Sequence, residues 1–358
     1  MSNNNLHENI REQSYDPNSV GRVKYDKATG KFRFTTEAPA VGSSEVIHEA
    51  AQEGFAAEAN PSGLPSLEQL YGRGCVFEKD NLRDKCVAFL ALGSVGAALA
   101  EKFAREGLGH FILVDFDRVE PHNLSRHIAG IQDIGRLKTD VVEEAILRKN
   151  PFAQIEKYPV NMMENRDLIA EIIAKADLVF CAPDNTDCRY MVAPLAEKAE
   201  KTVIYGWAAT RAEGVDVFIQ RPGEACYGCV AAAGLVTKEE ITNEASARES
   251  GVIPAYTSAA DADAIVQVGL PSDIDPMINL MVKLGLTELT RGEEDSGIES
   301  LGEELRTDNF FIWANRRTQR FIRYNPFNEP ENGPTILRWY GCTIPRIPTC
   351  GLCSETNR

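Results

Sequence analysis

Short apolar runs alternate with longer amphipathic segments through the middle of this chain. Apolar runs of strand length predict buried strands over residues 86–92, 110–114, 155–159 and 177–182. Between these runs, apolar residues recur every three or four positions, and Val95, Leu99 and Phe103 share one face of the first predicted helix. Strand, helix and strand at this spacing predict βαβ units. The fold class is therefore α/β, with a Rossmann-like, mostly parallel central sheet flanked by helices.

The two ends of the chain depart from this alternation. Residues 1–64 are interpreted as an N-terminal extension, with a hairpin over 23–36 and a short helix over 45–58. Near the other end, the pattern predicts an apolar helix over 275–290, an acidic loop over 292–304, and an antiparallel extension with strands over 309–314 and 335–340. The predicted divisions are the extension 1–64, a core 65–229, a crossover or lid segment 230–274 and a C-terminal part 275–358.

Length and charge limit the classes of function. The 358 residues suffice for one large domain with additions, or for two domains. Asp plus Glu number 53 against 38 Lys plus Arg, a formal net charge of −15, which disfavours binding to nucleic acid and to anionic lipid. The longest nearly uncharged apolar stretch, 87–100, is shorter than the ~20 residues that span a bilayer. We expect a soluble, cytoplasmic protein with neither nucleic acid nor membrane as partner.

A degenerate glycine loop follows the first predicted strand of the core. Gly93 and Gly96 open the following helix, while Ala91 occupies the place of a first glycine. Such a loop brings backbone N–H groups and a helix N-terminus to a phosphate. Asp115, at the end of the second strand, can accept hydrogen bonds from ribose hydroxyls. This combination predicts a nucleotide site; the alternative is that the glycines only permit close packing of helix on strand.

The segment after Asp115 adds cations to this predicted site. Asn123, Arg126 and Lys138 can follow a nucleotide from its ribose toward its phosphates. A nicotinamide oxidoreductase, which is a further alternative, has no need of these cations, and no hydride-transfer site is evident. With the segment 181–185 at the end of a later strand, followed by Arg189, these motifs resemble the ThiF/MoeB superfamily of adenylyltransferases, which includes ubiquitin-activating enzymes. The resemblance covers residues ~70 to 353.

The resemblance assigns roles to individual residues and makes 65–229 an ATP-binding adenylation core. Asp115 resembles the ribose-binding acid, and Asp117 a nearby polar contact. Asn123 and Arg126 are similar to the pair that touches the triphosphate, and Lys138 to the lysine that stabilises the reacting phosphate.

Two further parts of the predicted ATP site come from more distant segments. Asp184, beside Asn185, matches the aspartate that organises Mg²⁺ and ATP in the family. Arg73 corresponds to the arginine that family members insert into the ATP site of the neighbouring subunit, which implies a homodimer. The catalytic set implied by the resemblance is therefore Arg126, Lys138, Asp184 and Arg73.

The nine cysteines favour metal binding or thiol chemistry over a disulfide framework. Two CxxC pairs, Cys226 with Cys229 and Cys350 with Cys353, can together close a tetrahedral Zn²⁺ site. With four protein ligands the zinc would be structural, a clamp between the C-terminal end and the core; unmetallated thiols are the alternative.

The thioester cysteine of ubiquitin-activating relatives has no counterpart here. Residues 230–290 contain no cysteine, which leaves Cys188, Cys342 and Cys75 as candidates elsewhere, each more often an inert packing residue than a nucleophile. Residues 253–256 and the helix that follows them resemble family members from prokaryotic ubiquitin-like conjugation systems.

The resulting hypothesis is an ATP- and Mg²⁺-dependent adenylyltransferase. Its substrate would be the C-terminal carboxylate of a small ubiquitin-like or sulfur-carrier protein, with transfer to a downstream conjugating protein as a further step. A carboxylate is already a nucleophile at neutral pH, so the reaction needs alignment and cancellation of charge rather than a protein nucleophile. Adenylation of a peptide or nucleoside, and a catalytically silent scaffold that docks a carrier protein, are the alternatives.

Overall fold

The structure is a computed structural model that describes residues 22–26, 31–35, 66, 70–71, 79–209, 212–236, 269–293, 296–315 and 336–354. The chain divides into two compact units, Met1–Ser66 and Leu67–Arg358. In the first unit, β1 (Arg22–Asp26) pairs antiparallel with β2 (Lys31–Thr35), which confirms the predicted hairpin. The predicted helix over 45–58 lies outside the described residues.

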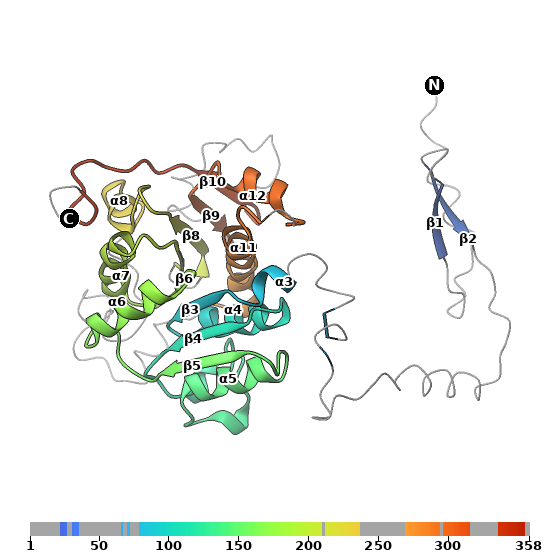
Figure 1. The fold of residues 1–358 in the computed structure, drawn as a ribbon, viewed down its shortest axis with the longest axis horizontal. Helices are drawn as coiled ribbons and strands as arrows, with labels where there is room; N and C mark the ends of the chain where they lie inside the picture. Colours follow the sequence, from blue (N-terminus) through green and yellow to red (C-terminus); the bar gives the residue numbers. More distant parts are fainter. Residues whose placement is uncertain are drawn as a thin grey trace. The chain divides into compact units, whose positions relative to one another are not determined.

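The second unit is built on a sheet of eight described strands in the order β10-β9-β8-β7-β6-β3-β4-β5 (Figure 1). Five neighbouring strands are parallel: β3 (Cys86–Leu90), β4 (His110–Val114), β5 (Gln154–Tyr158), β6 (Leu178–Cys181) and β7 (Val203–Ala208). Three antiparallel strands complete the sheet: β8 (Gly214–Gln220), β9 (Phe310–Ala314) and β10 (Trp339–Cys342). The mostly parallel α/β fold with an antiparallel C-terminal extension is confirmed.

Helices cover both faces of this sheet (Figure 1). One face packs against α6 (Arg166–Lys175), α7 (Thr186–Lys198) and α8 (Tyr227–Ala232). The other packs against α4 (Ser94–Arg105), α5 (Lys138–Leu147) and α11 (Pro271–Leu289). Two shorter helices are α3 (Lys79–Leu82) and α12 (Glu299–Leu305), and the 3-10 turns are η1 (Pro121–Asn123) and η2 (Ile131–Asp133).

The two cores are filled by alternate residues of the same strands, because successive side chains of a strand point to opposite faces. Phe89 belongs to the α4 side, where its ring lies 5.5 Å from Phe180 and 6.1 Å from Phe103. Leu90 belongs to the α7 side. A sheet covered on both faces needs nearly continuous apolar strands. The apolar runs of the sequence therefore predicted these strands.

Several elements differ from the pattern-based expectations. The hydrophobic pattern did not predict β7 or β8. All seven residues of β8 are buried, but Asp216 and Gln220 interrupt its apolar run. The expected acidic loop over 292–304 contains α12, and α11 begins at Pro271 rather than at 275, with proline in the first turn where its missing N–H costs nothing. The last strand of the described residues is β10, which begins at Trp339 and so lies later than the predicted 335–340.

Among the described residues, the helices are too short or too polar to cross a lipid bilayer.

Candidate active site

The parallel strands bring three predicted segments to one edge of the sheet. β3, β4 and β6 are neighbours, with β3 in the centre, so their carboxyl ends lie side by side. The glycine loop follows β3, Asp115 follows β4, and the turn with Asp184 follows β6. Open α/β sheets bind ligands at this edge.

The loop after β3 has the shape of a phosphate-binding turn although it begins with alanine. Ala91 adopts a left-handed backbone conformation, with φ of +74°, and its N–H donates to the carbonyl of Val114 at 2.9 Å. A methyl group on Gly96 would lie 1.9 Å from the carbonyl oxygen of Ala91, so only glycine fits at position 96. A methyl group on Gly93 would meet nothing within 4 Å, and Gly93 begins α4 without a side-chain cap. Gly93 therefore faces open space beside uncapped helix N–H groups.

Asp115 holds this loop against the end of β4. Its side chain is buried, with one carboxylate oxygen accepting from the Leu92 N–H at 2.6 Å and the other from the Asp117 N–H at 2.8 Å. Burial raises the pKa of Asp115, while nearby Lys138 and the two N–H groups oppose that rise. Each carboxylate oxygen can accept more than one hydrogen bond, so these contacts are compatible with a further donor.

Lys138 is the buried cation of the site. It is the first residue of α5, its Nζ donates to the Asp117 carboxylate at 2.7 Å, and its backbone N–H donates to the Asp117 carbonyl at 3.0 Å. The Lys138 side chain is 10% exposed, whereas that of Asp117 is 46% exposed. In this ion pair, the Lys138 ammonium group is therefore buried and the Asp117 carboxylate faces solvent.

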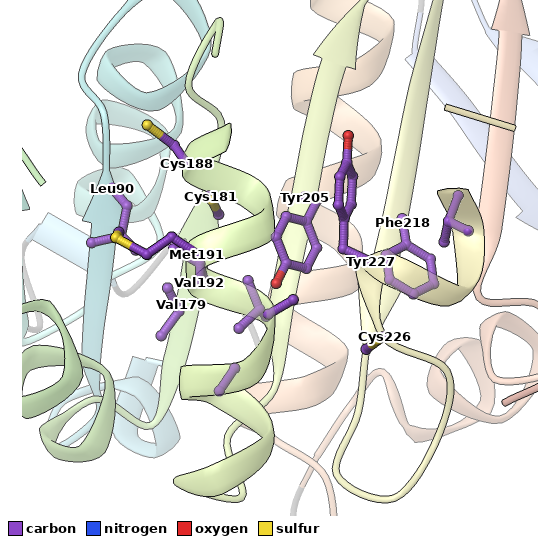
Figure 2. Close-up of a cluster of buried hydrophobic side chains, with 14 of the residues drawn as sticks. Leu90, Val179, Cys181, Cys188, Met191, Val192, Tyr205, Phe218, Cys226 and Tyr227 are labelled. Carbon is purple, nitrogen blue, oxygen red and sulfur yellow. The ribbon is translucent and has the colours of Figure 1, made fainter. Parts of the chain in front are cut away.

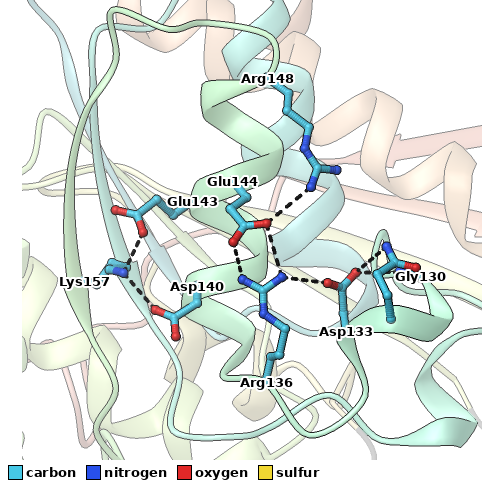
Figure 3. Close-up of polar contacts among 9 residues, drawn as sticks. Gly130, Asp133, Arg136, Asp140, Glu143, Glu144, Arg148 and Lys157 are labelled. Atoms are coloured by element: carbon cyan, nitrogen blue, oxygen red, sulfur yellow. Dashed lines mark hydrogen bonds and ion pairs between the residues drawn. The ribbon is translucent and has the colours of Figure 1, made fainter.

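The turn before Lys138 is fixed by a second set of ion pairs (Figure 3). Arg136 donates to Asp133 at 2.8 Å and also pairs with Glu144 on α5. Asp133 in turn accepts from the Gly130 N–H at 2.8 Å. Lys157, on β5, bridges Asp140 and Glu143 on the same helix. Arg136 and Lys157 are therefore engaged in structural pairs.

His127 ties the segment with Asn123 and Arg126 to the glycine loop. It is buried, its Nε2 lies 2.9 Å from the Leu92 carbonyl, and its Nδ1 accepts from the Ala129 N–H at 3.0 Å. Nε2 therefore carries the proton, and burial lowers the pKa of this imidazole, which keeps it neutral. The sequence pattern did not predict a role for His127, because nothing in the sequence distinguishes it from His122, which is exposed in the structure.

Arg126 donates to the His122 carbonyl at 3.3 Å and lies within electrostatic reach of Asp184. Arg126 is half-buried; burial lowers its pKa, and the nearby Asp184 carboxylate opposes that shift. The positive charges of Lys138 and Arg126 both contribute to the lowered pKa of His127. Asp184 is exposed in the turn after β6.

The two predicted asparagines have structural contacts of their own. Asn123 caps η1 by accepting from the Glu120 N–H at 2.9 Å, and Asn185 caps α7 by accepting from the Asp187 N–H at 2.7 Å. Arg73 and Cys75 lie outside the described residues.

The four cysteines of the CxxC pairs come together as predicted. The sulfur atoms of Cys226, Cys229, Cys350 and Cys353 lie within 4.8 Å of one another, and all four residues are buried. A buried set of four thiols at such separations fits a tetrahedral zinc ion, which closes its coordination with cysteines in structural sites. Arg346 also anchors the second pair, because it donates to Glu197 at 2.7 Å and binds the Cys353 carbonyl.

The remaining cysteine candidates are poorly suited to thioester chemistry. Cys188 is buried, and desolvation raises its pKa to about 11, so its thiolate is scarce at neutral pH. Cys342 pairs with Phe310, the first residue of β9. In the described sheet, β10 is the outermost strand, and β9, β8 and β7 separate it from β6, so Cys342 lies far across the sheet from the Asp184 turn.

Comparison with known protein families assigns this chain to one of them. The model of the ThiF family matches residues 73–291, more than half of the chain. The chain belongs to the ThiF family.

Curated relatives of this ThiF-family chain include adenylyltransferases and ubiquitin-like modifier-activating enzymes. Molybdopterin-synthase adenylyltransferase from Escherichia coli K12 is 33% identical over 165 residues, which is 45% of this chain and 65% of the relative. Ubiquitin-like modifier-activating enzyme 5 from Caenorhabditis elegans is 28% identical over 229 residues, 60% of this chain and 53% of the relative. This chain thus spans about half to two thirds of the length of these relatives.

Solved structures support the fold. E. coli MccB in complex with ATP superposes with a TM-score of 0.55 at 16% sequence identity, over 77% of this chain and 68% of MccB. Another MccB structure gives a TM-score of 0.57 at 15% identity, over 88% and 82% of the two chains. At this identity the likeness extends to the fold alone.

Proposed function

We propose that this ThiF-family protein is an ATP- and Mg²⁺-dependent adenylyltransferase that activates the C-terminal carboxylate of a small ubiquitin-like or sulfur-carrier protein. The observation that carries the proposal is that the glycine loop, Asp115 and the Asp184 turn follow the neighbouring strands β3, β4 and β6, with Lys138 near Asp115 and Arg126 near Asp184. Named relatives that activate ubiquitin-like modifiers or molybdopterin synthase support the same class of substrate.

In the proposed reaction, a carboxylate oxygen attacks the α-phosphorus of ATP, the bond to the β-phosphate oxygen breaks, and pyrophosphate leaves. The products are an acyl-adenylate and pyrophosphate. Gly93 and the uncapped N–H groups of α4 would receive phosphate oxygens, and Asp115, fixed by two backbone N–H groups, would accept from a ribose hydroxyl. Asn123 would contact the triphosphate from the capped turn of η1.

The main contribution proposed for the side chains of Arg126, Lys138 and Asp184 is to stabilise the negative charge on the pyrophosphate leaving group. Arg126 and Lys138 would neutralise negative charge that develops on pyrophosphate, in a half-buried setting where such interactions are strong. Asp184, with Asn185 beside it, would hold Mg²⁺, which supplies charge neutralisation and alignment of the phosphate groups. Asp117 would release Lys138 to the nucleotide, since this carboxylate faces solvent and can be hydrated.

Two observations favour an enzyme over a silent docking scaffold. Ala91 takes the left-handed conformation that a first glycine would take, so its substitution leaves the shape of the loop intact. Lys138 stays buried at the site, although a scaffold has no need to desolvate an ammonium group. We infer no thioester on Cys188 or Cys342, for the reasons of burial and location given above. Arg73 remains our proposed contribution from one protomer to its partner in a homodimer.

Pyrophosphate exchange tests this function. With a carrier protein present, the enzyme should return labelled pyrophosphate into ATP, and Lys138→Ala or Asp184→Ala should reduce the exchange rate by about 10² to 10³-fold. Lys157→Ala is the matched control, because it also removes a lysine ion pair next to α5 but lies in a structural pair. Exchange with a short peptide but with no carrier protein would favour the peptide alternative. Absence of exchange with every carboxylate would favour the scaffold.

A further inference from the structure

Arg189 is a buried charge that the proposed chemistry does not use. It lies in the first turn of α7 and is 1% exposed. Its Nη2 donates to the Pro183 carbonyl at 2.7 Å, and its Nη1 lies 3.4 Å from both the Thr186 hydroxyl and the Tyr227 hydroxyl. The guanidinium also lies over the Trp207 ring, 5.2 Å from its centroid.

This location is electrostatically unfavourable for a cation. The first turn of a helix carries the positive end of the helix dipole, and a buried guanidinium loses its hydration. An apolar side chain would fill the same space at a lower electrostatic cost. The contacts of Arg189 with a carbonyl, two hydroxyls and an aromatic face offset that cost and hold the guanidinium in one orientation.

The shortest of these contacts fixes the turn with Asp184. The Pro183 carbonyl belongs to the peptide group that joins Pro183 to Asp184, so its hydrogen bond to Arg189 sets the orientation of that peptide plane. On the other side, Asn185 is fixed as the cap of α7. The exposed Asp184 therefore lies between two anchored residues.

The other end of this network is the first cysteine pair. Tyr227 directly follows Cys226, and its ring packs against Tyr190, Tyr205 and Trp207 at centroid distances of 5.2 to 5.6 Å. In Figure 2, Cys226 lies at one end of the strands and the Tyr227 hydroxyl points toward the other. Register agrees, since Gln220, which precedes the pair, faces Val203 at the start of β7. Tyr227 thus spans from the metal-site edge toward the nucleotide edge.

We propose that Arg189 is a positioning residue for the Asp184 turn. In this proposal, the Tyr227 hydroxyl holds Arg189 in place and so connects the first cysteine pair to that turn. The functional meaning of this inference rests on the proposed role of Asp184 in holding Mg²⁺. The positioning itself is a property of the fold and can be measured without nucleotide.

Three variants of the full chain test the inference. Tyr227→Phe keeps the ring and removes the hydroxyl that faces Arg189, and Arg189→Lys keeps the charge but loses the planar fork. Tyr190→Phe is the matched control, because it removes a hydroxyl from the same ring cluster. Hydrogen exchange by mass spectrometry follows the amides of residues 184–187, and Mn²⁺ with ATP, detected by electron paramagnetic resonance, reports on metal–nucleotide binding.

We expect Tyr227→Phe and Arg189→Lys to speed exchange in 184–187 and to weaken Mn²⁺–ATP binding, each by about tenfold, as for a lost hydrogen bond to a charged group. Tyr190→Phe should change neither, and zinc content should stay constant in all three. Unchanged exchange in Tyr227→Phe would overturn the support by Tyr227, and unchanged exchange in folded Arg189→Lys would overturn the positioning role. If Arg189→Lys does not fold, faster exchange in Tyr227→Phe supports the positioning role, and unchanged exchange in that variant overturns the whole inference. If the unmodified protein binds no Mn²⁺–ATP, the proposed function fails, while the exchange data still decide the positioning.

Discussion

A methyl group on Gly96 would lie 1.9 Å from the carbonyl oxygen of Ala91. This contact explains how the loop after β3 combines an alanine with a phosphate-binding shape. The left-handed Ala91 turns its carbonyl onto the first turns of α4, and Gly96 leaves room for it. The loop then exposes Gly93, where a side chain would meet only open space.

The two glycines should therefore respond differently to the same substitution. Gly96→Ala should destabilise the protein by about 3 kcal/mol, because backbone atoms must move to admit the methyl group. Gly93→Ala should cost no more than about 1 kcal/mol, since φ of −69° suits alanine and only the N-cap preference for glycine is lost, but it should weaken ATP binding by about tenfold or more. Urea unfolding and calorimetric titration with ATP measure the two quantities. Equal losses of stability, or full ATP affinity in Gly93→Ala, would contradict this division of roles.

Replacing Ala91 by glycine should stabilise the fold. A left-handed conformation costs a residue with a Cβ roughly 1 to 2 kcal/mol, and the greater freedom of glycine in the unfolded chain offsets only part of this gain. We expect Ala91→Gly to raise the free energy of unfolding by about 0.5 kcal/mol. Ala98→Gly, inside α4, is the control and should lower it by about 1 kcal/mol. Destabilisation by both variants to the same extent would show that Ala91 bears no strain.

His127 should make stability depend on pH in the mildly acidic range. Burial lowers its pKa in the folded state below the ordinary 6.5, so between the two pKa values the unfolded chain binds more protons at this residue. Its contribution is fully present above pH ~6.5 and is lost as pH falls toward the folded pKa. His127→Gln should flatten this part of the stability curve, measured by urea unfolding from pH 5 to 8.

The exposed His122 provides the comparison for that experiment. His122→Gln should keep the slope of the unmodified protein. His127→Gln should also lose about 1 to 3 kcal/mol at pH 7.5, because one terminal amide cannot both donate to the Leu92 carbonyl and accept from the Ala129 N–H as the two ring nitrogens do. An unchanged acid slope in His127→Gln would mean that the imidazole is not held neutral by the fold.

The cysteine cluster should bind zinc with a fixed stoichiometry. Four buried sulfur atoms within 4.8 Å of one another predict about one zinc per chain by elemental analysis. Cys229→Ser should lower zinc content and stability together, whereas Cys342→Ser, at a cysteine outside the cluster, should change neither. A folded chain without metal would remove zinc from this account and leave a cluster of packed thiols.

The sequence predicted the parts of this protein that depend on local pattern. Continuous apolar strands, the stripe of Leu99 and Phe103 and the two CxxC spacings each follow from one segment at a time, and the fold class and the cysteine cluster are confirmed. The strand β8 was not predicted because two polar residues, Asp216 and Gln220, break its apolar run. Both are buried, and tertiary contacts keep the strand in the sheet.

The geometry of the site depended on contacts between distant segments. The ion pair of Lys138 with Asp117 joins residues 21 positions apart, and the bond of His127 to the Leu92 carbonyl spans 35 positions. No periodicity encodes such pairs. The location of Cys342 on the outermost described strand likewise depends on the order of the strands in the sheet, which single residues do not reveal.

The most direct test of the account is a crystal structure with Mg²⁺ and a non-hydrolysable ATP analogue. We predict the triphosphate at Gly93, with the Lys138 ammonium group moved from Asp117 to a phosphate oxygen, the Arg126 guanidinium group on the phosphates and the metal at Asp184. A nucleotide bound elsewhere, or Arg126 and Lys138 turned away from its phosphates, would contradict the central claim.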